Sequence, residues 1–159
     1  MAFPLFDKII EATASFTPDT SAYSANDVVG SHANATTGAM TFDISGTSSG
    51  AGLINKLLVY DDDNEGAAGA LWLFTQDLAT PILDNAGFSL VLADWDNWIT
   101  TLTLPSFTTY NSIKQAVLPD INDTFKVTKN LIYGYFVCSG TPTYAGSKTI
   151  KFRLGILTQ

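Results

Sequence analysis

Apolar and polar residues alternate in several short segments of this chain, and this pattern limits what the chain can fold into. In residues 10–16, apolar side chains occupy every second position, with hydroxyl or carboxyl side chains between them. The alternation returns in residues 40–44 and 150–156. Because successive side chains of a strand point to opposite faces, this period predicts strands with one face on a core.

Eight segments in all are predicted to be strands, with turn-forming residues between most of them. Aromatic residues make up 12% of the chain and threonine is frequent, and both residue classes suit a pleated, half-buried surface. The predicted strands are residues 10–16, 40–44, 53–60, 70–76, 99–104, 124–128, 131–139 and 150–156.

This spacing predicts an all-β fold made of two antiparallel sheets packed face to face. Strands that follow one another without intervening helices are typical of a β-sandwich with Greek-key connections, and about eight strands favour a jelly-roll-like topology. Little helix is expected, although residues 111–118 could form one or two helical turns before the proline that follows. A hairpin is predicted between residues 124–128 and 131–139, because only two residues separate them.

No repeat, linker or change of composition divides the rest of the chain, so residues 9–159 are expected to form a single β-sandwich domain. A chain of 159 residues can bury roughly 70% of its unfolded surface in one core.

The first eight residues are interpreted as an N-terminal arm. They hold three large apolar side chains, Phe3, Leu5 and Phe6, and Pro4 disfavours a helix there. Two interpretations stay open: the segment packs against its own core, or it docks on a neighbouring molecule.

The charge composition excludes one class of partner. The formal net charge is −7, from 15 acidic and 8 basic residues, and no cluster of Lys or Arg occurs along the chain. Binding to nucleic acid needs cations that neutralise phosphates, so no nucleic-acid partner is expected. An acidic balance can complement a basic partner surface.

Neither an oxidising compartment nor a membrane is indicated by the sequence. Cys138 is the single cysteine and has no partner for an internal disulfide. The N-terminus does not resemble a signal peptide, and no apolar window reaches the roughly 18 residues of a transmembrane helix. We expect synthesis in the cytoplasm and no membrane span.

Nucleophilic catalysis is not indicated either. His32 is the only histidine, and it lies in a polar stretch without a nucleophile-elbow pattern, so a solvated loop residue is the favoured interpretation. Cys138, within a predicted strand, is expected to be a packed side chain and not a reactive thiol. The chain is therefore not expected to be an enzyme.

A metal site is considered at residues 61–66, Asp-Asp-Asp-Asn-Glu-Gly, because alternating oxygen ligands followed by a glycine resemble the start of a calcium loop. The twelfth position of such a loop requires a carboxylate, and here it is Trp72 inside a predicted strand. An acidic turn between two strands is the favoured interpretation. No metal and no cofactor are expected.

The densest group of aromatic and acidic residues is Asp94-Trp95-Asp96-Asn97-Trp98. Indole rings beside carboxylates are what a sugar-binding platform or a glycosidase uses. A packed, hydrogen-bonded loop is the favoured interpretation, with sugar binding and acid/base catalysis as alternatives.

Two stretches of the chain carry short motifs in a recognisable order. The first is residues 16–30, in which a Thr/Ser-rich lead is followed by Ala-Tyr and then by Asp-Val-Val-Gly. In the second, Leu73-Phe74 is followed by Pro81, by the pair Asp84-Asn85 and by an acidic, aromatic loop that reaches Asp94. Both stretches resemble structural proteins encoded by tailed bacteriophages, whereas the final third of the chain carries no such motif.

This resemblance implies a jelly-roll capsid decoration, or cement, protein without enzyme activity. Such a protein is made in the host cytoplasm, resides in the virion on the outer capsid surface, binds the major capsid protein and stabilises the shell. A homo-oligomer is expected, with a trimer favoured. Candidate partner-binding residues are Phe3, Leu5 and Phe6 in the arm, and Trp95 and Trp98 for an outer or intersubunit contact. The alternative is a carbohydrate- or receptor-binding module of a phage tail, spike or fibre.

Overall fold

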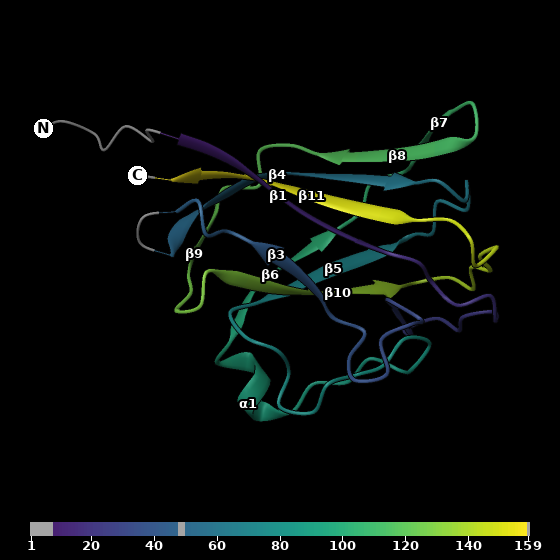
Figure 1. Ribbon diagram of the computed structural model, residues 1–159, viewed down its shortest axis with the longest axis horizontal. Coiled ribbons are helices and arrows are strands. Elements are labelled where there is room, and N and C mark those ends of the chain that lie inside the picture. Colours follow the sequence, from purple (N-terminus) through teal and green to yellow (C-terminus); the bar gives the residue numbers. More distant parts are fainter. Residues whose placement is uncertain (1–7, 48–49, 159) are drawn as a thin grey trace, which may run out of the picture.

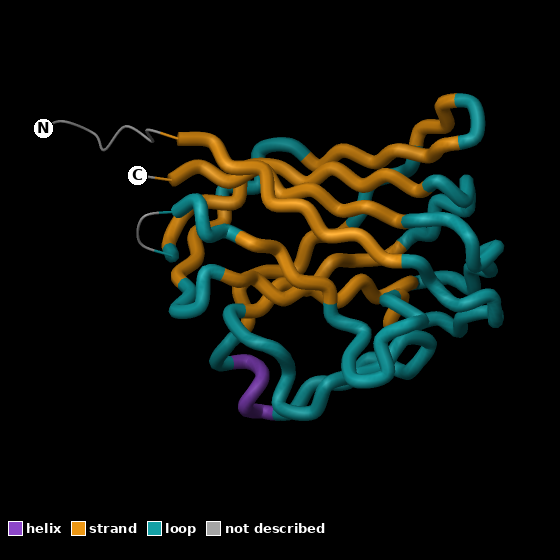
Figure 2. Tube along the Cα trace, viewed as in Figure 1, coloured by secondary structure: helices purple, strands orange, loops and turns teal. Residues whose placement is uncertain are grey.

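Two antiparallel sheets packed face to face make up most of the molecule, as Figures 1 and 2 show. The structure is a computed structural model that describes residues 8–47 and 50–158. Within those residues, α1 (Leu92–Trp95) is the one α-helix, a single turn, and no helix is long and apolar enough to cross a membrane. The all-β prediction with little helix is confirmed.

The strands divide between two sheets that we call the first and the second sheet. In the first sheet the order is β1 (Lys8–Phe16), β11 (Ile150–Thr158), β4 (Ala51–Asp61), β8 (Ile113–Leu118) and β7 (Thr108–Tyr110), with β9 (Asp123–Lys126) also paired to β4. In the second sheet the order is β2 (Val28–Val29), β10 (Leu131–Cys138), β5 (Gly69–Phe74) and β6 (Trp98–Thr103), with β3 (Met40–Asp43) also paired to β10.

The pairing of the eight predicted strands follows a nested order. The outermost two in sequence, β1 and β11, pair with each other, as do β3 with β10, β4 with β9, and β5 with β6. These four pairs fall alternately in the first and the second sheet. This nested order of antiparallel pairs is the one expected of a jelly roll, and the predicted sandwich of two antiparallel sheets is confirmed.

The main core lies between the two sheets, where the alternation of the sequence predicts it. Ala12, Ala14 and Phe16 of β1 are buried and the residues between them are exposed. Phe152 of β11 stacks on Phe16 at 6.0 Å between ring centroids and contacts Phe136 of the second sheet at 5.3 Å. Aromatic rings from both sheets therefore close the sandwich.

A second apolar cluster lies on the outer side of the second sheet. The long segment 75–97 crosses this side, visible in Figure 1 as the loop and α1 below the sheet. Its Leu78 and Ile82 are buried against outward-facing aromatic residues of β5 and β10. The buried members of this cluster are Val28, Phe74, Leu78, Ile82 and Tyr135.

Residues 111–118 do not form the predicted helical turns. They form the end of a tight turn and β8, in which Ile113 faces Tyr110 of β7 and Ala116 faces Val59 of β4. Asn111 takes a left-handed φ of 55°, which an asparagine tolerates in a turn between strands. Strand pairing on both sides of this segment outweighs its weak helical pattern.

The predicted hairpin of residues 124–128 and 131–139 is wrong. β9 pairs with β4 in the first sheet, whereas β10 belongs to the second sheet, so residues 127–130 cross from one sheet to the other. Val127 donates its backbone N–H to Gly50 O and turns its side chain into the main core. Both segments point apolar residues at one core from opposite sides, and the sequence pattern of that arrangement resembles a hairpin.

Candidate functional site

Four apolar side chains are exposed together where α1 meets β6, and we call them the α1 patch: Val91, Leu92, Trp95 and Trp98. Leu92 is 87% exposed, Val91 51%, Trp95 49% and Trp98 42%. The indole rings of Trp95 and Trp98 meet edge to face, with centroids 5.9 Å apart. A contiguous exposed apolar group on a monomer indicates an interaction site more often than scattered single residues do.

The patch is held in place by a buried carboxylate. Asp94 is 3% exposed, and its two oxygens accept hydrogen bonds from the backbone N–H groups of Ala79 and Val91, both at 2.8 Å. The first bond ties α1 to the preceding loop, and the second caps the first turn of the helix. Asn97 continues the anchoring, because its carbonyl accepts from Thr75 N at 2.8 Å, directly after β5.

Aromatic packing supports the patch from below. Trp72, on the outer side of β5, contacts Trp95 at 6.3 Å and Phe88 at 5.1 Å between ring centroids. Trp98 begins β6 and donates its indole N–H to Thr101 Oγ1 at 3.1 Å. The exposed indoles are thus positioned by contacts with residues of the second sheet.

The predicted partner-binding residues have different outcomes. Trp95 and Trp98 are brought together and are half exposed, although they are also packed on neighbours. Phe3, Leu5 and Phe6 lie outside the described residues. Sequence reasoning missed Val91 and Leu92. The signal was the apolar run of residues 90–93 directly before the acidic tryptophan segment, which has no strand period.

Asp94 and Asp96 are separated by their surroundings. Asp96 is exposed at the end of α1, whereas the buried carboxylate of Asp94 is occupied by two backbone donors. The helical turn between them places the two side chains on different sides. Asp94 therefore positions the patch and does not face a bound sugar.

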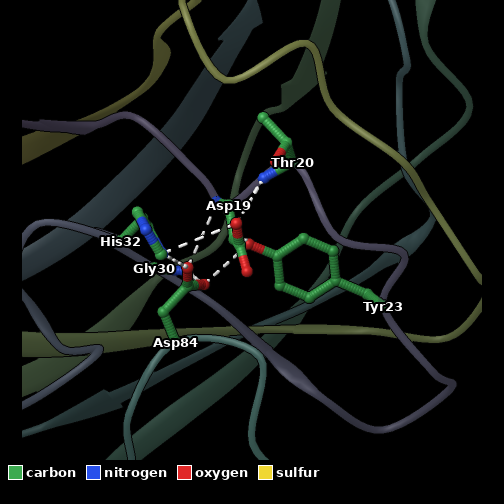
Figure 3. A network of polar contacts seen from close by, with 6 residues as sticks. All are labelled: Asp19, Thr20, Tyr23, Gly30, His32 and Asp84. Carbon is green, nitrogen blue, oxygen red and sulfur yellow. Dashed lines mark hydrogen bonds and ion pairs between the residues drawn. The ribbon is translucent and has the colours of Figure 1, made fainter.

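A cluster of polar side chains surrounds Asp84, in the interior of segment 75–97 (Figure 3). Asp84 Oδ1 accepts from the hydroxyl of Tyr23 at 2.7 Å and from Gly30 N at 2.8 Å, and Oδ2 accepts from Asp19 N at 3.2 Å. His32 Nδ1 lies 3.6 Å from Asp19 Oδ1 and 3.9 Å from Asp84 Oδ2. Three loops distant in sequence are joined here.

Burial determines the electrostatics of this group. Loss of solvent raises the pKa of Asp84 above its usual value, and the hydrogen bonds that it accepts oppose that shift. Burial, together with the bond to Asp84, also raises the pKa of the Tyr23 hydroxyl, which stays a donor. The imidazole of His32 is largely exposed, as predicted, but two carboxylates lie beside it. The described contacts of the imidazole are therefore to carboxylates, in a group that joins loops.

The acidic turn at residues 61–66 uses its own oxygens. Asp61 is buried, and its carboxylate accepts from Asp63 N at 2.9 Å and from Gly66 N at 2.6 Å. Asp63 accepts from Ala145 N at 2.6 Å. Within the described residues, 8–47 and 50–158, no three His, Cys, Asp or Glu side chains are placed to hold a metal ion. The turn is stabilised by backbone donors at the positions where a calcium loop would bind its ion.

Cys138 is buried at the end of β10, and its thiol lies 3.2 Å from Ser24 O. Loss of solvent raises the pKa of the thiol above its usual value, so the thiolate is disfavoured. The side chain packs in the main core.

The outer face of the first sheet carries a shallow, open hollow of about 650 Å³. Polar and charged side chains surround it, among them Tyr60, Lys151 and Arg153. The Arg153 guanidinium lies over the Tyr60 ring and donates to Glu11 Oε2 at 3.1 Å and to Tyr60 Oη at 3.0 Å. Arg153 is thus paired with Glu11, and the apolar side chain of Ile113 also lines the hollow.

No family model, curated protein or solved structure matches this chain. Its function is therefore argued from its own residues.

Proposed function

We propose that this protein is a structural component of a virion, a decoration protein that binds the outer surface of a capsid shell and stabilises it. The observation that carries the proposal is the α1 patch. A one-turn helix that projects Leu92 and Trp95 from a jelly roll, with Trp98 of β6 beside them, is suited to docking on another protein, because buried aromatic and aliphatic anchors supply most of the energy of such contacts.

The composition of the patch favours a protein partner over a sugar. Sugar platforms combine an aromatic face with free hydrogen-bonding groups, but here the side chains with the largest exposed fractions, Leu92 and Val91, are aliphatic. The indole N–H of Trp98 is already bonded to Thr101, and each oxygen of the Asp94 carboxylate accepts a backbone N–H, which leaves Asp96 as the exposed carboxylate beside the patch. Aliphatic groups gain most when they enter an apolar pocket of a protein.

Shell stabilisation follows from linkage. A ligand that binds the assembled shell and not its separated subunits stabilises the assembled state by mass action. Contacts of Asp94, Asn97 and Trp72 hold α1 in place before binding. Binding therefore costs little conformational entropy.

Co-sedimentation with expanded, undecorated capsids of the phage that encodes the chain tests this proposal, together with the native mass in solution. The proposal predicts saturable binding at a fixed ratio to capsid subunits and an oligomer that matches a capsid symmetry axis, with a trimer favoured. A monomer that does not bind at micromolar concentration contradicts it.

A carbohydrate- or receptor-binding module of a tail, spike or fibre is the second candidate, favoured by the half-exposed rings of Trp95 and Trp98. A glycan array decides between the two. Binding that is lost in Trp95→Ala and Trp98→Ala variants of native stability supports this alternative, whereas a silent array removes it.

A further inference from the structure

The formal charges divide unequally between the two sides of the sandwich. The second sheet, with the loops attached to it in residues 17–47, 66–104 and 131–147, contains no Lys or Arg at all. We call these three segments the cation-free half. Six of the eight basic residues lie in strands of the first sheet: Lys8, Lys56, Lys114, Lys126, Lys151 and Arg153. The other two are Lys148, just before β11, and Lys129, between β9 and β10.

Acidic residues are not segregated in this way. Of the 15 acidic residues, seven lie in the cation-free half, so the remainder of the chain has eight acidic and eight basic residues. The formal charges of these three segments therefore sum to −7 and those of the remaining sequence to zero, and Asp43 and Asp96 are the exposed members of the seven. The seven are Asp19, Asp27, Asp43, Asp77, Asp84, Asp94 and Asp96.

The α1 patch lies within this half. Asp96, exposed beside Trp95, is the acidic group next to the patch in sequence, and the nearest basic residues along the chain are Lys56 and Lys114. An apolar centre with acidic and uncharged polar surroundings is complementary to an apolar pocket with a basic rim.

We propose that the α1 patch and the cation-free half dock on a basic protein surface of the capsid shell, leaving the outer face of the first sheet toward solvent. The partner surface supplies an apolar pocket for Leu92 and Trp95, and Lys or Arg side chains around it. This inference rests on the proposed function and adds to it the docking face, the orientation on the shell and the charge of the partner.

A second copy of this chain is a poor occupant of the same face. A two-fold contact through the α1 patch would bring two cation-free halves together, with Asp96 of each copy near the other. Like charges across an interface without counter-charges oppose association. Self-association of the chain is therefore expected to use a different surface.

Two variants of the docking face and one matched control test the inference. In Leu92→Asp, a charge replaces the most exposed apolar group of the patch, and in Asp96→Lys the charge beside it is reversed. Glu65→Lys makes the same charge change on an exposed residue outside the cation-free half. Folding of each variant is verified by circular dichroism and thermal unfolding before use.

Equilibrium co-sedimentation with expanded, undecorated capsids is the readout, at low and at high salt. We expect Leu92→Asp to weaken binding roughly tenfold or more and Asp96→Lys roughly threefold or more, with Glu65→Lys close to the unmutated protein. Higher salt should weaken capsid binding by the unmutated protein, because salt screens exposed charges. It should also reduce the difference in affinity between the unmutated protein and Asp96→Lys.

The outcomes separate this inference from the proposed function. If the unmutated protein does not bind capsids, both fail. If it binds and both docking-face variants bind equally well, only the assignment of the face is overturned. If Asp96→Lys and Glu65→Lys weaken binding by the same factor, only net charge matters, and the proposed basic rim around the α1 patch is contradicted.

Discussion

The outer faces of the two sheets are built in opposite ways. The outer face of the first sheet is open and mixed in character: Arg153 pairs with Glu11, and Ile113 and Val117 of β8 are exposed apolar side chains. The outer face of the second sheet is covered by segment 75–97 over an apolar cluster that includes Phe74 and Tyr135, and it carries no Lys or Arg. The outer face of the first sheet is exposed to solvent. The outer face of the second sheet is covered by a further layer, segment 75–97, which carries most of the α1 patch.

This difference suggests a division of roles, in which the main core provides most of the stability and segment 75–97 provides the binding surface. The main core between the sheets needs only the period-two strands, whereas the second cluster also needs segment 75–97, which lies outside the second sheet. Binding surfaces are often placed on such additions while the scaffold stays rigid. The predictions below test whether the two layers separate in this way.

The largest effect is expected from the main core. Phe152 is fully buried and contacts rings of both sheets, so Phe152→Ala should lower the free energy of unfolding by about 4 kcal/mol. Leu78→Ala, in the outer cluster, should cost about 2 kcal/mol, because a surface segment can relax into the space left. Chemical denaturation measures both. Equal losses would contradict the separation of the two layers.

A smaller effect is expected from the carboxylate that anchors α1. Asp94→Ala removes the acceptor of the Ala79 and Val91 N–H groups and should lower the free energy of unfolding by about 1 to 2 kcal/mol. Hydrogen exchange of the 75–97 amides should accelerate while that of β11 changes less. Asp96→Ala is the matched control, since its side chain is exposed and should change stability by less than about 0.5 kcal/mol.

The group around Asp84 predicts a pH dependence. Burial raises the folded-state pKa of Asp84 above its unfolded value, so the folded state binds this proton more tightly. Its contribution to stability is present below the unfolded pKa and is lost as pH rises through the raised folded pKa. Asp84→Asn should therefore reduce the fall in stability as pH rises above about 4. Unfolding midpoints measured at several pH values in both proteins decide this, and identical profiles would contradict it.

The smallest effect on stability is expected at the α1 patch. Leu92 is almost fully exposed, so Leu92→Ser should change the free energy of unfolding by less than about 0.5 kcal/mol. Thermal unfolding checks this. A loss above about 1 kcal/mol would mean that Leu92 packs within its own chain and is not available to a partner.

Sequence patterns predicted strands with one buried face better than strands that segment 75–97 covers on their outer side. In β1 and β11, only one face is buried, so alternation marks both the strands and their inward residues. β10 is apolar on both faces because segment 75–97 covers its outer side, and its strand was predicted while its sheet was not. β2 and β7, with two and three residues, are too short to show a period.

The candidate site could be predicted only in part for a related reason. Trp95 and Trp98 stand out by composition, but α1 is one turn long, too short for a helical period, and Asp94 is buried only because the fold brings Ala79 to it. The absence of Lys and Arg from three segments can be read in the sequence. That these segments belong to the second sheet and its loops is known only after the strands are assigned to sheets.

Hydrogen exchange of the chain free and bound to expanded capsids tests the central claim most directly, because it compares the two faces in one measurement. The proposed docking face predicts that binding protects the backbone amides of residues 75–98 and leaves those of β1 and β11 nearly unchanged. Protection confined to β1, β11 and the outer face of the first sheet, with residues 75–98 unaffected, would contradict it.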